Sequence, residues 1–108
     1  MTTQLNNFSD SEQILIRTQN SEYKFSVTDP EERRGTLSGG SLGEQKRDAV
    51  LVGTLADNNR VATDSLELKA GRRALFFLQA RHGVERLVTS VITGITRNRP
   101  FDNERRAA

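Results

Sequence analysis

Residues 22–28, EYKFSVT, alternate strictly between polar and apolar side chains, which is the clearest indication of fold class in the sequence. Aromatic and β-branched residues repeated at a period of two are typical of a half-buried strand. Residues 13–18, QILIRT, form a shorter run of the same kind, and the polar residues 19–21 between the two runs favour a turn. We therefore predict a β-hairpin over residues 13–28.

The rest of the chain also shows the pattern of strands. Further strands are predicted at residues 48–55, 73–80, 84–89 and 92–96, with a tight turn at His82-Gly83 and a kink near Ser90-Val91. No window of about 11 residues carries the apolar stripe of an amphipathic helix. The predicted fold is therefore all-β: a small, strongly bent antiparallel barrel or roll of about five to six strands, which would also protect the strand edges.

Two segments fit less clearly into this fold. Residues 31–46 contain four of the eight glycines and only two large apolar residues, so we expect a long Gly-rich loop, with at most a short bridge at 36–38. Residues 65–71 fit a single helical turn or an irregular approach to the next strand. The expected core consists of Ile14, Ile16, Tyr23, Phe25, Val27, Val50, Val52, Ala74, Phe76, Leu78, Leu87 and Ile95.

Length and composition set the outer limits of the fold. Leu, Ile, Val and Phe make up 27 of 108 residues, which suffices for one small core but not for two domains. We expect a single domain over residues 12–97, with flexible polar tails over 1–11 and 98–108. The chain has no cysteine, no apolar run of membrane-spanning length and no export signal in its first residues. A soluble protein of the cytoplasm is the expectation.

One candidate binding site lies in the predicted loop. Glycines allow backbone N–H groups to converge on an anion, and guanidinium groups bind phosphate through two parallel hydrogen bonds. The candidate residues for a phosphate group or a partner are Arg33, Arg34, Ser38, Gly39 and Gly40.

This stretch resembles the sequence pattern of PilZ domains, small β-barrels that bind cyclic di-GMP. PilZ domains pair an Arg-x-x-x-Arg segment with a downstream Asp-x-Ser-x-x-Gly strand motif. Here the two arginines are adjacent, Thr36 stands in the place of the Asp, and Ser41 stands where the motif needs Gly. The resemblance covers roughly ten residues and would imply a cyclic-dinucleotide or other phosphate ligand, because guanidinium groups both bind phosphate and stack on guanine.

A second candidate site follows from the uneven distribution of charge. Residues 1–68 carry seven Lys and Arg against eleven Asp and Glu, a net −4, whereas residues 69–108 carry nine against three, a net +6. A basic face on a small β-barrel is a common means of binding single-stranded nucleic acid. The candidate residues are Arg72, Arg73, Arg81, Arg86, Arg97 and Arg99. Most aromatic rings are assigned to the core, however, and single-strand binders usually stack bases on exposed rings.

Catalysis has little support in the sequence. His82, the single imidazole, precedes Gly83 in a predicted turn that would expose it to solvent. The acidic residues show no spacing typical of metal ligands. We therefore expect no enzyme activity, no metal and no cofactor.

The leading hypothesis is a small non-enzymatic binding or regulatory module with an unknown protein partner. That partner would contact the loop at 33–43 or a strand edge, and the chain could also associate with itself through such an edge. The first alternative is a single-stranded nucleic-acid-binding barrel that uses the basic half of the chain. The second alternative is a PilZ-like binder of a cyclic dinucleotide or another phosphate ligand.

Overall fold

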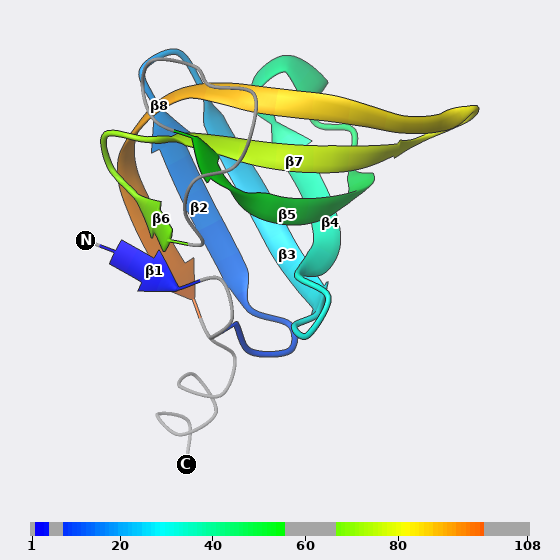
Figure 1. Cartoon of the computed structure of the whole chain (residues 1–108), viewed down its shortest axis with the longest axis horizontal. Coiled ribbons are helices and arrows are strands. Elements are labelled where there is room, and N and C mark those ends of the chain that lie inside the picture. Colours follow the sequence, from blue (N-terminus) through cyan, green and yellow to red (C-terminus); the bar gives the residue numbers. More distant parts are fainter. Residues whose placement is uncertain (1, 5–7, 56–66, 99–108) are drawn as a thin grey trace.

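Six strands form one antiparallel sheet that closes into a ring (Figure 1). The computed structural model describes residues 2–4, 8–55 and 67–98. The ring runs in the order β2 (Gln13–Thr18), β3 (Glu22–Asp29), β4 (Arg34–Gly39), β5 (Arg47–Leu55), β7 (Arg73–Ala80) and β8 (Gly83–Asn98), and β8 pairs back onto β2. The prediction of a small, bent, antiparallel all-β fold is confirmed. The ring is irregular, since β4 and β5 share only four residue pairs.

The predicted hairpin is present as β2 and β3. Ile14 lies opposite Phe25 and Ile16 opposite Tyr23, and all four side chains are buried inside the ring. The alternation of β3 therefore has the physical cause that the sequence suggested: one face fills the core and the other meets solvent.

The strand β8 closes the ring because it pairs with β7 along one half of its length and with β2 along the other. Its first half pairs with β7 as far as Val91, and its second half pairs with β2 from Ile92 onward. We predicted two strands, 84–89 and 92–96, with a kink between them. The structure joins them into one strand, and a register shift in each pairing supplies the bend without breaking the ladder. The β7–β8 hairpin projects beyond the rest of the ring (Figure 1).

The predicted long loop at 31–46 is wrong in its central part. Arg34–Gly39 is the strand β4, followed by a 3-10 turn at Gly40–Leu42. A Cβ atom at Gly35 would lie 2.0 Å from the carbonyl oxygen of Ser26 on β3. Glycine here permits close approach of two strands, so its presence marks tight pairing in this segment and not a loop.

The core fills the inside of the ring. Phe25 and Phe76 meet edge to face, with ring centroids 5.4 Å apart, and the buried cluster extends along every strand of the ring. The expectation is wrong for β5, where Ala49 and Leu51 point inward while Val50 and Val52 are only half-buried. Leu87 is also half-buried and packs against the outside of the cluster. Residues 50–52 are all aliphatic, so no polar residue marks the outer face there.

Part of the predicted N-terminal tail is attached to the ring. Phe8 is buried, with its ring centroid 6.4 Å from that of Phe25, and β1 (Thr2–Gln4) pairs with β6 (Glu67–Lys69). Within the segment 65–71, predicted as a helical turn or an irregular approach to the next strand, Glu67–Lys69 is the strand β6 with Leu68 buried, and residues 65 and 66 lie outside the described residues. Of the predicted C-terminal tail, residues 99–108 lie outside the described residues.

Candidate functional site

A row of four side chains crosses the outer surface of the ring. Residues directly opposite one another in neighbouring strands share a face of the sheet. Arg34 on β4 lies opposite Val50 on β5, Val50 lies opposite Phe77 on β7, and Phe77 lies opposite Arg86 on β8. An aromatic side chain therefore has an arginine beside it on β8 and a second arginine two strands away.

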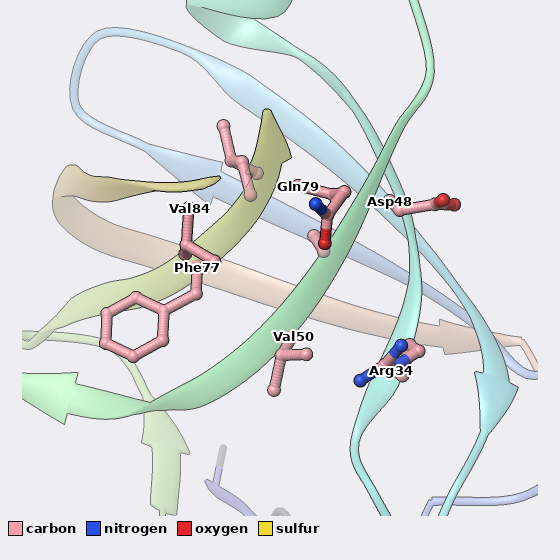
Figure 2. A pocket seen from close by; sticks show the side chains of 8 residues that line it. Arg34, Asp48, Val50, Phe77, Gln79 and Val84 are labelled. Carbon is pink, nitrogen blue, oxygen red and sulfur yellow. The ribbon is translucent and has the colours of Figure 1, made fainter. Parts of the chain in front are cut away.

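The centre of this surface is apolar and exposed. Phe77 is 41% exposed and Val84 is 63% exposed, and these are the large hydrophobic side chains that stand out in solvent in the described part of the chain. Both line a hollow of about 170 Å³. Figure 2 shows Phe77 beside Val84, with Val50 between Phe77 and Arg34. We call this surface the Phe77 face; it comprises Arg34, Asp48, Val50, Phe77, Gln79, Val84 and Arg86.

The exposure of Phe77 has a local cause in the sequence of β7. Phe76 is fully buried, and the period of a strand turns the next side chain to the opposite side. Residues 74–78 are uniformly apolar, a pattern typical of a strand covered on both faces. In the structure Leu75, on the same face of β7, is buried, whereas Phe77 lies nearer the hairpin turn and remains partly in solvent.

The arginines predicted to bind nucleic acid do not form a single strip. Arg86 belongs to the Phe77 face, and Arg81 is exposed in the turn of the β7–β8 hairpin. Arg72 donates from Nε to Thr54 Oγ1 at 2.9 Å, and Arg73 donates from Nη1 to the Thr89 carbonyl at 3.4 Å. Arg97 lies in a buried ion pair, and Arg99 is outside the described residues.

The ion pair of Arg97 with Glu12 has a structural role in the ring. The Glu12 carboxylate is fully buried and accepts hydrogen bonds from Arg97 through both of its oxygens, with Arg97 Nη2 at 2.9 Å from Oε1. The backbone N–H of Ser9 also donates to Glu12 Oε1 at 2.8 Å. The Arg97 guanidinium lies 5.8 Å from the centroid of the Phe8 ring. These contacts tie the N-terminal segment to the end of β8.

The residues of the predicted phosphate site are separated along β4. Arg33 has a positive φ of 54° in the turn before the strand, and its Nε donates to the Leu51 carbonyl at 3.1 Å. Arg34 belongs to the Phe77 face. Ser38, Gly39 and Gly40 lie at the other end of β4, where Gly39 is opposite Tyr23 and a Cβ at Gly40 would lie 2.2 Å from the Tyr23 ring. These glycines allow close packing against Tyr23.

Other parts of the described surface offer fewer groups that could bind a ligand. A hollow of about 490 Å³ lies over β2, β3 and the end of β8; it includes Gly39 and the charged residues Glu22 and Lys24, but no arginine lines it. His82 is exposed in the hairpin turn. The described residues contain no group of three or more His, Cys, Asp and Glu that could hold a metal ion.

Closure of the ring removes most of the strand edge expected for self-association. In the described chain, β8 pairs on one side only, with β7, over Gly83–Val88, and it pairs with β2 from Ile92. An edge is therefore present in the projecting hairpin, next to Val84.

Comparison of the chain with protein-family models, with curated proteins and with the solved structures found no match in any of the three. No helix in the described ranges is long and apolar enough to span a membrane.

Proposed function

We propose that the protein is a small non-enzymatic binding module and that its binding surface is the Phe77 face. One observation carries this proposal: the exposed large hydrophobic side chains, Phe77 and Val84, line the same hollow. Scattered single apolar residues are normal on a protein surface, whereas a cluster bordered by polar groups is typical of an interaction site.

The rigid framework supports the proposal. Phe77 and Val50 are on strands that pair on both sides, so their backbones are held in place before any partner arrives. A pre-formed surface loses little conformational entropy on binding.

The expectations of a soluble protein in the cytoplasm and of no catalytic activity belong to this proposal and rest on the sequence.

The phosphate-ligand alternative has weaker support. It needs Arg33 and Arg34 to converge with the glycines, but Arg33 donates to the Leu51 carbonyl and the glycines pack against Tyr23 at the far end of β4. The nucleic-acid alternative gains support from the row that runs from Arg34 through Phe77 to Arg86.

Photo-crosslinking tests the proposed surface whatever the chemistry of its partner. A benzophenone amino acid is placed at position 77, at position 84 or, as a control, at position 24, which is exposed on the outer face of β3. After irradiation in the cells that make the protein, discrete adducts are expected at 77 and 84 and not at 24. Absence of adducts at both sites, or equal adducts at position 24, would overturn the proposal.

A further inference from the structure

We infer that the Phe77 face binds single-stranded nucleic acid, with one base stacked on Phe77 and the backbone phosphates near Arg34 and Arg86. This inference rests on the proposed function, because it names the partner of the same surface. It differs from the arrangement expected from sequence, which used a strip of arginines from the second half of the chain.

The first support is an aromatic platform. The Phe77 ring is 41% exposed on the outer face, and its cross-strand neighbours are the aliphatic Val50 and the long side chain of Arg86. Every nucleobase has a flat π-face, so an exposed ring on a rigid sheet binds bases with little preference for sequence. Val84 and Val50 extend the apolar area beside the ring (Figure 2).

The second support is the position of the cations. The row crosses three strand spacings of about 4.8 Å each, which separates the backbones of Arg34 and Arg86 by about 14 Å, with Phe77 between them. A single strand that runs across the sheet would therefore meet an arginine, the ring and a second arginine in turn. Arg81, exposed in the turn of the same hairpin, adds a further positive charge.

The third support is the state of Arg34. Arg17, Arg47 and Arg97 each form an ion pair with a glutamate of this chain. In contrast, the exposed Arg34 guanidinium makes no hydrogen bond or ion pair within the described ranges. A cation that has no intramolecular partner loses nothing within the protein when it binds a phosphate.

A protein surface is a less suitable occupant. Apolar residues alone would suit either class of partner, but arginines in line with an exposed ring match a chain that repeats base and phosphate. A protein partner, or a second copy paired along the edge of β8, is kept as an outcome of the test.

The test is fluorescence anisotropy with the full chain and labelled single-stranded DNA of about 15 nucleotides, one all-thymine and one of mixed sequence. Binding to both is expected at low salt and should weaken steeply as salt rises from about 50 to about 200 mM. Phe77→Leu keeps the apolar bulk but removes the ring, and it should weaken binding about tenfold. Arg34→Gln should reduce the slope of log K against log salt by about one.

Arg17→Gln is the matched control, because it removes an arginine from the outer face of β2 and leaves the Phe77 face intact. It should bind as the natural chain does. Phe77 and Arg34 both point away from the core and the Arg17 ion pair is exposed, so the thermal unfolding temperature of each variant should stay within a few degrees of the natural value.

Two results would overturn the inference. If no oligonucleotide binds at low salt while crosslinks to a protein or to a second copy form at position 77, the proposed surface stands and nucleic acid is excluded as its partner. If oligonucleotides bind equally well to the natural chain, Phe77→Leu and Arg34→Gln, nucleic acid binds elsewhere, and the Phe77 face is not its site.

Discussion

Phe76 and Phe77 are consecutive residues of β7 whose rings lie on opposite sides of the sheet. Phe76 is fully buried and meets Phe25 edge to face, whereas Phe77 stands 41% exposed on the outer surface beside Arg86. One residue therefore contributes to the stability of the ring, and its neighbour is available to a partner.

This difference in burial predicts unequal losses of stability from two similar substitutions. Phe76→Ala should lower the free energy of unfolding by about 3–5 kcal/mol, because it removes a large buried side chain and leaves a cavity. Phe77→Ala should lower it by only about 1–2 kcal/mol, since the side chain is 41% exposed and its removal leaves no enclosed cavity. Urea unfolding followed by circular dichroism measures both values. Equal losses in the two variants would contradict the assignment of inner and outer faces.

The buried pair of Glu12 and Arg97 predicts a large cost when one partner is removed. Glu12→Gln leaves the Arg97 charge half-buried without its carboxylate and should destabilise the fold by about 3–5 kcal/mol. Glu22→Gln is the control, because it breaks the exposed pair with Arg17 and should cost at most about 1 kcal/mol. The measurement is the denaturant midpoint of each variant at neutral pH. Similar midpoints for the two variants would show that the buried pair does not hold the N-terminal segment.

Substitution of two strand glycines by alanine should change the stability of the fold by different amounts. At Gly35 a Cβ would lie 2.0 Å from the Ser26 carbonyl oxygen, so Gly35→Ala should force β4 away from β3 and cost about 1–3 kcal/mol. At Gly94 on β8 a Cβ would meet no atom within 4 Å, so Gly94→Ala should change stability by less than about 1 kcal/mol. Thermal unfolding of the two variants checks the difference. A neutral Gly35→Ala would show that the two strands are not closely paired there.

The attachment of Phe8 predicts that the N-terminal segment contributes to stability. Phe8 packs against Phe25 and lies under the guanidinium of Arg97, so Phe8→Ala should cost about 3 kcal/mol. A residue of a flexible tail would cost nothing when truncated. Amide hydrogen exchange at Ile14 and Phe25 would report the same loss as faster exchange in the variant.

The fold could be predicted wherever polar residues mark one face of a strand. In β3 the charged Glu22 and Lys24 flank Tyr23, so the alternation determined which side chains enter the core. In β5 the aliphatic residues 50–52 carry no such mark, and the inward and outward faces were exchanged. The burial of Ala49 and Leu51, together with the pairing of Val50 with the exposed Phe77, resolves the choice.

The candidate site could be predicted only in part, because it depends on contacts between distant strands. Arg34 and Arg86 were each named from the sequence, but for two different ligands. They share one surface because β4, β5, β7 and β8 are neighbours in the ring. Phe77 was missed because the five consecutive apolar residues 74–78 suggested a strand covered on both faces, although the wall of a barrel has an inside and an outside. Gly35 was wrongly assigned to a loop, because the close pairing of β3 and β4 is not visible in the local sequence.

A nuclear magnetic resonance titration shows directly whether the Phe77 face binds single-stranded nucleic acid. Backbone amide signals of the isotope-labelled chain are followed as an all-thymine single strand of about 15 nucleotides is added at low salt. If nucleic acid binds there, the largest shifts fall on Val50, Phe77 and Arg86, while the signals of Leu15 and Lys24 on β2 and β3 stay in place. An unchanged spectrum, or shifts concentrated on β2 and β3, would contradict binding at the Phe77 face.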